Sequence, residues 1–277
     1  MNNRFTGLDI GTSCIKAVEI EAVDGGFKVL SLQKCPTPAG PDEELVTALK
    51  GVIPSSHGKV IASVGGDQVI YRIVRFPLLS GKELEAAVSY EMERFLPSPA
   101  EQMIIRHVCL GTGQEGTGQD VLLLAVSKAA IYHYYKLLSR AGLVVEAVDL
   151  SAFALWRIYG RKTIDSRAII DLGAKFTTII IVKKGVIKLV RVLPNHRESL
   201  DAGLNGVAEE IRRSLIYYAN QEETSVERVI LSGGGSKQDG LPGFAQTFLG
   251  VPVQVGKPAV PPVFAVAAGL ALREGMR

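Results

Sequence analysis

Apolar and polar positions alternate in several short segments of the first part of the chain, which is typical of half-buried strands. We expect strands at residues 5–10, 14–20, 27–32, 60–64, 69–76, 103–110 and 120–126. Apolar residues at helical spacing predict helices at 42–52, 84–95 and 127–140. Ser80 and Glu83 form a capping-box pattern before the second helix, and Pro97 ends it.

The second part of the chain begins with a similar series of strands. They are expected at residues 167–171, 176–182 and 186–192, followed by strands at 228–231 and 251–255. Helices are predicted at 205–221, 241–248 and 262–274. Strands mixed with helices in this order indicate an α/β fold.

A short motif is repeated at the start of the two parts. Asp9-Ile10-Gly11 lies at the end of the first strand, and Asp171-Leu172-Gly173 at the end of the first strand of the second part. In both places another strand comes directly after the turn, so the order is strand, Asp-x-Gly turn, strand. This weak internal repeat predicts two related halves.

The residue types in these turns suit a phosphate group. Gly11 and Gly173 permit sharp bends, and successive backbone N–H groups in such turns form anion-binding nests. Hydroxyl donors and one cation are also near the two turns: Thr12, Ser13, Lys16, Thr177 and Thr178. Asp9 and Asp171 are poor phosphate ligands, but they suit a hydrated Mg²⁺ ion that bridges phosphate oxygens.

A third segment points to the same chemistry. The run Ser232-Gly233-Gly234-Gly235-Ser236 lies between an apolar strand and a predicted helix, where glycine permits close approach of a ligand. One Asp-x-Gly turn alone is common in hairpins, and so are glycine-rich turns between strand and helix. It is the two matched turns, with the glycine run after the second, that favour a nucleotide phosphate site.

The composition narrows the classes of protein further. The chain has 277 residues, 47% of them hydrophobic and 21% charged, which predicts a globular protein with a large core. Its net charge of +3 gives no reason to expect nucleic-acid binding. The three cysteines, Cys14, Cys35 and Cys109, have neither disulfide nor metal spacing, and we expect a cytoplasmic protein. Without an apparent signal peptide or membrane span, any membrane role is expected to be peripheral.

Three segments together resemble the nucleotide motifs of the superfamily of actin, heat-shock chaperone, FtsA and sugar-kinase ATPases. They are LDIGTSCIK at 8–16 (phosphate-1), IIDLGAKFTTI at 169–179 (phosphate-2) and LSGGGSKQDGLPGF at 231–244 (adenosine loop). The resemblance implies an actin-like ATPase fold of two RNase H-like domains, here 1–160 and 161–277, with ATP and Mg²⁺ bound between them. Asp9 and Asp171 are then the expected metal residues.

Within this superfamily the chain is similar to the PilM family of type IV pilus assembly proteins. ERFLPSPAE at 93–101, AGLVVEAVDLSAF at 141–153 and AVAAGLALR at 265–273 carry this resemblance. It implies a cytoplasmic, ATP-binding adaptor that docks the N-terminal tail of a PilN-like inner-membrane protein. Pilus motor and platform proteins are further implied partners. It also implies an inserted subdomain of the 1C type at about residues 77–155.

One feature departs from the pattern of this superfamily. Only residues 194–205 lie between the third strand of the second half and its long helix, which leaves a reduced helical subdomain. The spacing of Glu209, Arg212 and Arg213 on that helix resembles an adenosine-contacting pattern. An ordinary exposed, charged helix face is an equally open interpretation of these three residues.

The inserted subdomain is the expected place for a partner. An exposed edge of its predicted sheet would accept a peptide strand, with Phe95, Leu96 and Met103 giving side-chain specificity. Self-association through the same edge is the alternative. Two other functions of the superfamily stay open: a small-molecule kinase, for which Asp149 is a faint candidate base, and a filament-forming cell-division protein like FtsA. ATP hydrolysis is expected to be slow or absent.

Overall fold

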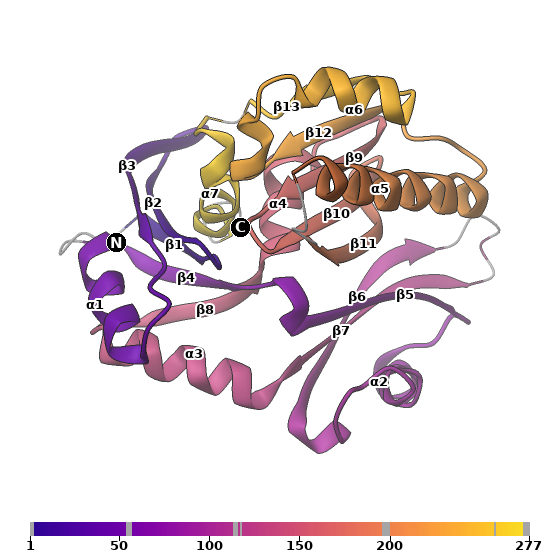
Figure 1. Ribbon diagram of the computed structural model, residues 1–277. Coiled ribbons are helices and arrows are strands. Elements are labelled where there is room, and N and C mark those ends of the chain that lie inside the picture. Colours follow the sequence, from indigo (N-terminus) through magenta and orange to yellow (C-terminus); the bar gives the residue numbers. More distant parts are fainter. Residues whose placement is uncertain are drawn as a thin grey trace. The chain divides into compact units, whose positions relative to one another are not determined.

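The computed structural model describes residues 3–53, 57–112, 116, 118–195, 200–257 and 259–273, without the side chains of 200–205. The chain divides into two compact units (Figure 1). The larger unit consists of Met1–Gly66 together with Tyr135–Arg277, and the smaller unit is Asp67–Tyr134.

The first sheet of the larger unit begins as a meander of three antiparallel strands. Its strand order is β3-β2-β1-β4-β8, and β4 and β8 join in parallel. The bounds are β1 Arg4–Ile10, β2 Cys14–Val23, β3 Gly26–Pro36, β4 Lys59–Val64 and β8 Val145–Leu150. The alternation of apolar positions thus predicted the meander, and the crossover through helix α1 (Asp42–Val52) places β4 beside β1.

The second sheet repeats this topology strand for strand. Its order is β11-β10-β9-β12-β13, with an antiparallel meander followed by two parallel strands. The bounds are β9 Ser166–Leu172, β10 Phe176–Lys183, β11 Val186–Pro194, β12 Arg228–Ser232 and β13 Val253–Val255. Helix α5 (Leu200–Glu222) makes the crossover that α1 makes in the first sheet. The repeat expected from the two Asp-x-Gly motifs is therefore also a repeat of sheet topology.

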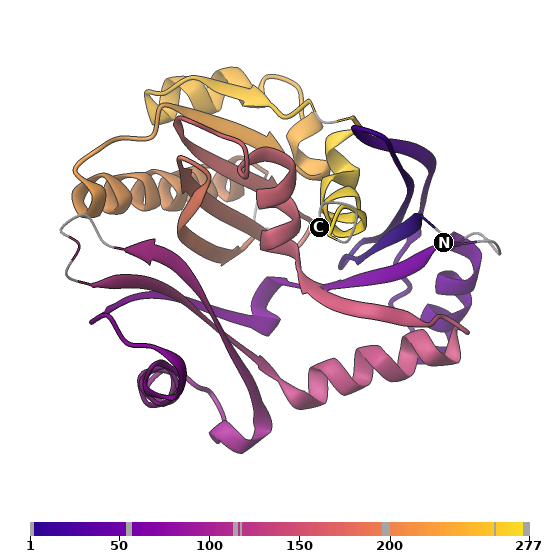
Figure 2. The same ribbon diagram turned by 180° about the vertical axis from the view of Figure 1, so that it is seen from behind.

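Each sheet is covered by helices on both faces. On its outer face the first sheet packs against α1 and against Leu137 and Leu138 of α3 (Lys128–Arg140), and the second sheet against α5 and α6 (Leu241–Leu249). The two inner faces meet α7 (Ala265–Ala271) and α4 (Ser151–Tyr159), which pack against each other (Figure 2). The α4–α7 pair thus joins the two halves of the larger unit.

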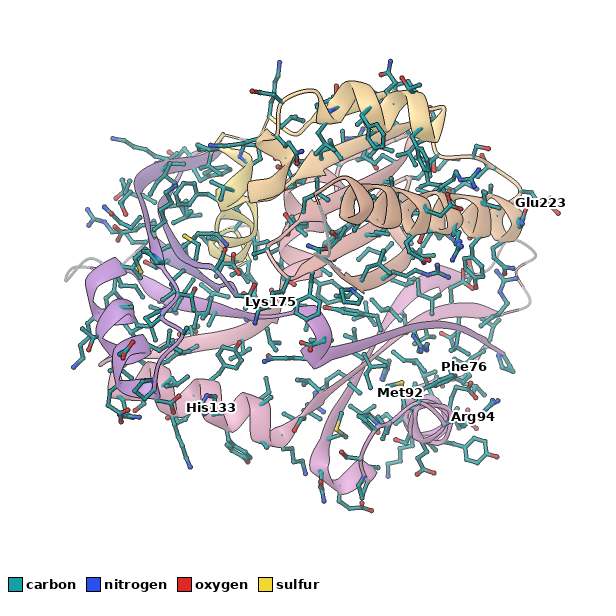
Figure 3. All side chains as sticks on the ribbon, in the orientation of Figure 1. Phe76, Met92, Arg94, His133, Lys175 and Glu223 are labelled. Carbon is teal, nitrogen blue, oxygen red and sulfur yellow. The ribbon has the colours of Figure 1, made fainter. Side chains whose placement is uncertain are left out.

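The smaller unit is a three-stranded sheet with one helix on its face. The order is β5-β7-β6, all antiparallel, so that β6 is an edge strand. The bounds are β5 Val69–Phe76, α2 Gly81–Glu93, β6 Met103–Thr112 and β7 Gln119–Ser127. Phe76 and Met92 lie together in the core between α2 and the sheet (Figure 3).

The structure differs from the sequence-based expectations in several elements. Strand β8 and helix α4 lie in the stretch 145–159, for which the pattern predicted no element. Helix α5 begins at Leu200 rather than at 205, which leaves only 195–199 after β11. Ser80 does occupy the N-cap position of α2, but its side chain makes no capping hydrogen bond. In the part of the chain that the structure describes, four short 3₁₀ turns complete the element order: η1 Gly66–Gln68, η2 Ala100–Gln102, η3 Gly234–Lys237 and η4 Pro262–Phe264.

The expected insertion at 77–155 overlaps the smaller unit, whereas β8 and most of α4 lie within that range but belong to the larger one. Among the residues that the structure describes, no helix is both long enough and apolar enough to cross a lipid bilayer.

Candidate functional site

The two Asp-x-Gly turns have the same backbone geometry. Gly11 N–H donates to the carbonyl oxygen of Cys14 at 3.1 Å, and Gly173 N–H donates to that of Phe176 at 3.0 Å. A Cβ atom on Gly11 or Gly173 would stand 2.9 or 2.7 Å from the same oxygen. Glycine is therefore required at both positions by the approach of the turn's own carbonyl group, and the turn is closed before any ligand is considered.

The carboxylate of Asp9 is already engaged within the first half. Asp9 and Lys16 stand opposite each other on β1 and β2, and Lys16 Nζ lies 2.9 Å from Asp9 Oδ2. Ser63, at the end of β4, donates its hydroxyl to Asp9 Oδ1 at 3.3 Å. Burial acts to lower the pKa of Lys16, but the charge and hydrogen bond of Asp9 outweigh it and raise this pKa above its ordinary value.

Asp171 has an equivalent position but a different environment. It pairs with Ser232 of the parallel strand β12, and the Ser232 hydroxyl is a hydrogen-bond partner of its carboxyl group. Its Oδ1 atom is buried and has no hydrogen-bond partner among the described residues. Burial, and next the charge of Asp9, raise the pKa of Asp171 to about 6, although Lys16 acts in the opposite direction. The two acidic turns are therefore close enough to interact electrostatically.

Tyr159, the last residue of α4, extends this environment and was missed by the sequence reasoning. Its Oη atom lies 3.4 Å from Ser232 Oγ. Burial raises the pKa of Tyr159 to about 12, so that its hydroxyl stays protonated over the physiological range. Ser232 is fully buried and also contacts the carbonyl oxygen of Pro262 at 3.3 Å. Ser232 thus links Asp171 to Tyr159 and to the segment that leads into α7.

The predicted hydroxyl donors fall into two groups. Thr12 and Ser13 are exposed in the first turn, where they are accessible to a ligand. Thr177 and Thr178 are both buried in β10. The Thr177 hydroxyl donates to Asn195 Oδ1 at 2.8 Å, so it acts inside the protein rather than at the surface. Lys175 is exposed in the second turn between β9 and β10 (Figure 3).

The glycine run packs directly on the second acidic turn. Gly233 has a positive φ of 80°, and a Cβ atom there would stand 2.6 Å from the carbonyl oxygen of Leu172. A Cβ atom on Gly235 would stand 2.9 Å from Leu172 Cβ, whereas one on Gly234 would meet only Val263 Cγ2, at 4.0 Å. Ser236 is buried and donates its hydroxyl to the carbonyl oxygen of Gly233 at 2.7 Å. The run is therefore next to Asp171, as the motif order predicts.

A second repeat accompanies the first and supplies the signal that could have identified Ser63. Ser63-Val64-Gly65-Gly66 forms the end of β4 and the turn after it, and Ser232-Gly233-Gly234-Gly235 does the same for β12. Because β4 is the parallel neighbour of β1 and β12 that of β9, both serines reach the carboxylate of the adjacent acidic turn. Each half thus contributes an Asp-x-Gly turn and a Ser-x-Gly-Gly turn.

The charged residues of α5 pair with one another on its exposed face. Arg212 donates to both oxygens of Glu209, at 2.9 and 3.1 Å, and the hydrogen bonds from Arg212 lower the pKa of Glu209. Arg213 Nη1 lies 2.7 Å from Glu210 Oε1. The guanidinium of Arg212 also lies 5.7 Å from the ring centroid of Phe248 on α6. The described geometry suits the interpretation as a solvated charged face, and it leaves the adenosine-contacting role as a prediction.

Asp149, the faint candidate for a kinase base, is held in an ion-pair network. Arg157 Nη2 lies 2.6 Å from Asp149 Oδ2, and Arg273 Nε lies 3.5 Å from the same oxygen. The backbone N–H of Leu150 donates to the other oxygen at 2.7 Å. Asp149 is buried, so this carboxylate ties β8 to α4 and to the chain after α7. Its geometry argues against a role as a general base.

The three residues expected to contact a partner have unequal accessibility in the smaller unit. Phe95 is 36% exposed, and the guanidinium of Arg72 lies 4.9 Å from its ring centroid. Leu96 is partly buried against the core, and Met103 is 7% exposed within it. Met103 therefore belongs to the packing of α2 on the sheet, and its side chain is not offered to a ligand as expected.

Carboxylates of the described residues form no cluster of three or more potential metal ligands. Asp9 and Asp171 are a pair, and one oxygen of that pair, Asp171 Oδ1, is buried without a partner. A hydrated Mg²⁺ ion keeps most of its waters and needs few protein carboxylates, so this donor set fits such an ion better than a fully protein-coordinated one.

Comparison with known proteins bears on the family and the fold of the chain. The sequence model of the type IV pilus assembly protein PilM matches residues 7–194. A solved structure described as the PilM–PilN type IV pilus biogenesis complex matches with a TM-score of 0.84 and 26% identity, covering 100% of this chain and 99% of that chain.

Two more distant solved structures show the same fold. A Bacteroides thetaiotaomicron protein with an actin-like ATPase fold and unknown function has a TM-score of 0.57 and 14% identity, covering 97% of this chain and 96% of the other. The cytoplasmic domain of EpsL, an inner-membrane component of the Vibrio cholerae type II secretion system, has a TM-score of 0.59 and 11% identity, covering 97% and 94%. The chain has the actin-like ATPase fold, and the match of its sequence over 7–194 shows that it belongs to the PilM family of type IV pilus assembly proteins.

Proposed function

We propose that this protein is an ATP-binding adaptor of the type IV pilus machinery that docks the cytoplasmic N-terminal tail of a PilN-like membrane protein. The observation that carries the nucleotide part is the matched pair of closed acidic turns with the glycine run packed on the second one. Membership of the PilM family and the likeness to a chain of a PilM–PilN complex support the partner part.

In this proposal the phosphates lie between the two turns. Thr12 and Ser13 offer exposed hydroxyl groups, and turn amides form the anion-binding nest. Asp171 would hold a hydrated Mg²⁺ ion through its free Oδ1 atom, which supplies charge neutralisation for the phosphate oxygens. Asp9 would act chiefly through Lys16, because both of its oxygens are already engaged.

Lys16 is the cation that would face the phosphates. Its ammonium group is paired with Asp9, and its flexible stem permits it to share this group with a phosphate oxygen. The raised pKa of Lys16 keeps it charged at neutral pH. The glycine run 233–235 and Ser236 would border the nucleoside, with Glu209, Arg212 and Arg213 of α5 as its outer contacts.

Hydrolysis is expected to be slow or absent. The described carboxylates near the turns are Asp9, which is paired with Lys16, and Asp171, which is the proposed metal residue. Asp149 is engaged by Arg157 and Arg273, so it is no free base. The short connection between β11 and α5 also leaves little chain for a lid that would exclude water.

The unit Asp67–Tyr134 is the proposed docking module. Its edge strand β6 can pair with an extended peptide, and Phe95 under Arg72 offers an aromatic anchor beside the core. A tail bound in this way would tether the protein to the inner membrane, which places it at the cytoplasmic face next to the pilus motor and platform proteins. A filament-forming role like that of FtsA would use the same edge for self-association.

Calorimetry with the full chain tests the nucleotide part directly. Wild-type protein should bind ATP more tightly with Mg²⁺ than with EDTA, and Asp171→Ala should abolish this Mg²⁺ dependence while the protein stays folded. Tyr218→Phe is a matched control, because it removes a buried Tyr–Ser hydrogen bond of 2.8 Å at the other end of β9. Equal ATP affinity in wild type and Asp171→Ala, with and without Mg²⁺, would contradict the proposal.

A further inference from the structure

One residue fixes the backbone of the first acidic turn from outside. Thr37 follows the end of β3, and its hydroxyl donates to the carbonyl oxygen of Gly11 at 2.7 Å. Its backbone N–H donates to the carbonyl oxygen of Ser13 at 3.1 Å. Two hydrogen bonds from a single residue thus hold both ends of the turn 11–13.

The second acidic turn is held in the same way by a residue of a different type. Asn195 follows the end of β11, and its Nδ2 atom donates to the carbonyl oxygen of Gly173 at 2.9 Å. Its backbone N–H donates to the carbonyl oxygen of Lys175 at 2.8 Å. Its Oδ1 atom also accepts the hydroxyl of Thr177 at 2.8 Å, which fixes the orientation of the amide group.

The two residues are equivalent in the repeat. Each comes directly after the proline that ends the third strand, Pro36 or Pro194, and this proline pairs with the first residue after the acidic turn. Each donates its side chain to the glycine carbonyl of the turn and its backbone N–H to the carbonyl two residues later. The arrangement therefore occurs twice with different side chains, Thr37 and Asn195, which indicates that its geometry serves the turns.

The planar peptide bond links this arrangement to the ligand side. In a trans peptide unit the C=O and the following N–H point in opposite directions. When Thr37 holds the carbonyl of Gly11, the N–H of Thr12 is turned away from Thr37. When Asn195 holds the carbonyl of Gly173, the N–H of Ala174 is turned away from Asn195 in the same manner.

We propose that Thr37 and Asn195 are paired positioning residues of the phosphate site, each holding a turn so that the N–H of Thr12 or Ala174 is directed at a nucleotide phosphate. This inference rests on the proposed nucleotide binding. It adds that the two amides are preorganised by residues outside the three sequence motifs. We call the hydrogen bonds from Thr37 the first clamp and those from Asn195 the second clamp. Without either clamp the turn amide must be ordered when the ligand binds, and affinity for phosphates falls.

The test for the first clamp compares two substitutions of one side chain. Thr37→Val keeps the shape of threonine but removes the donor to Gly11, and Mg·ATP affinity is expected to fall about tenfold. Thr37→Ser keeps the hydroxyl and should stay within about threefold of wild type. Thr47→Val is the matched control, because its hydroxyl bonds the Glu43 carbonyl on exposed α1, away from the turns.

The second clamp can be replaced by the first. Asn195→Leu keeps the branched shape but loses all side-chain hydrogen bonds, so Mg·ATP affinity should fall at least tenfold. Asn195→Thr places the residue of the first clamp at the equivalent backbone position, and it should recover most of the affinity. A residue that served packing alone would show no such recovery.

Adenosine and tripolyphosphate separate this proposal from the proposed function. Calorimetry should show that Thr37→Val and Asn195→Leu weaken tripolyphosphate and Mg·ATP but leave adenosine affinity unchanged. Amide exchange of Gly11 and Gly173, whose N–H groups close the two turns, should rise in the same variants without ligand. If wild type binds Mg·ATP and both variants bind it equally well, the clamps do not position the turns. If wild type binds neither Mg·ATP nor tripolyphosphate, both the proposed nucleotide site and the proposed role of the clamps are contradicted.

Discussion

Lys16 Nζ lies 2.9 Å from Asp9 Oδ2, and both side chains are mostly buried, with 14% and 13% of their surfaces exposed. No such cation pairs with Asp171 among the described residues, and its Oδ1 atom has no partner. The two halves share one backbone geometry, but their carboxylates differ in charge compensation. This asymmetry places the buried cation beside the first turn and the unpartnered carboxylate oxygen beside the second.

Removal of Lys16 should therefore destabilise the fold as well as weaken nucleotide binding. Lys16→Met leaves the charge of Asp9 buried with only the Ser63 hydroxyl, and the free energy of unfolding should fall by about 3 kcal/mol. Urea denaturation measures this change. In the double variant Asp9→Asn/Lys16→Met no charge is stranded, so much of the loss should be recovered, whereas additive losses would contradict the interpretation.

The raised pKa of Asp171 predicts a pH-dependent gain of stability for Asp171→Asn in metal-free buffer. The ordinary pKa of 3.8 applies to the unfolded chain and the value of about 6 to the folded protein. Between these values the folded protein binds the extra proton, so the free energy of unfolding of wild type falls as pH rises through this window. Above about pH 6 the folded protein bears the full cost of ionising the buried carboxyl group of Asp171.

Asp171→Asn should therefore be more stable than wild type at pH 7.5 by about 2–3 kcal/mol, and this difference should shrink toward pH 4.5. Denaturation with EDTA at several pH values measures it. A stability difference that does not change between pH 4.5 and 7.5 would show that the carboxyl group is not held at a raised pKa. Asp165→Asn is not a suitable control, because Asp165 pairs with Arg167 and Arg228.

The thiol of Cys14 provides a probe of the first turn. Cys14 is half-buried directly after the turn, and its carbonyl accepts the N–H of Gly11. A nucleotide seated between the turns should slow alkylation of Cys14 severalfold. Cys109 is exposed on β6 of the other unit and should react at the same rate with and without Mg·ATP, which makes it an internal control. Peptide mass spectrometry follows both thiols in one sample.

The ion-pair network of Asp149 predicts a structural rather than a chemical role. Arg157→Met removes the 2.6 Å partner of a buried carboxylate and also the bond from Arg157 to the Gly269 carbonyl, so stability should fall by about 3–5 kcal/mol. Asp149→Asn should leave Mg·ATP affinity within about twofold of wild type. A loss of phosphoryl transfer in Asp149→Asn, with an unchanged melting temperature, would favour the kinase interpretation.

Much of the fold was predictable because its signals are local. The alternation of apolar positions and the glycine turns identify β1–β3 and β9–β11, and the two Asp-x-Gly motifs identify the repeat. The stretch 145–159 gave no clear signal, since its short apolar run and the helix directly after it are separated by no turn residue. Strand β8 is specified instead by its parallel pairing with β4, which is distant in sequence.

The site residues that the sequence did not predict also depend on contacts between segments distant in sequence. Ser63 and Tyr159 reach the acidic turns only because parallel strands and α4 are placed there by tertiary packing. Thr37 and Asn195 lie next to prolines, where the sequence predicts only a strand end. The proximity of Asp9 and Asp171 depends on the α4–α7 pair that joins the two sheets, and no local pattern encodes it.

The proposed partner surface of the smaller unit can be tested at Phe95. Phe95 is a partly exposed aromatic residue beside its core, with the guanidinium of Arg72 4.9 Å from its ring centroid. Aromatic anchors of this kind dominate peptide recognition, so Phe95→Ala should weaken binding of a synthetic PilN-like N-terminal tail about tenfold. Met103→Leu is the control, because Met103 is buried and a change of similar volume should leave affinity unchanged.

Titration of the full chain, followed by amide shifts, should perturb residues of β6 and those around Phe95. If the tail does not bind at millimolar concentration, and if ultracentrifugation shows oligomers that Phe95→Ala dissolves, this surface serves contact between copies of the chain instead of docking a membrane protein.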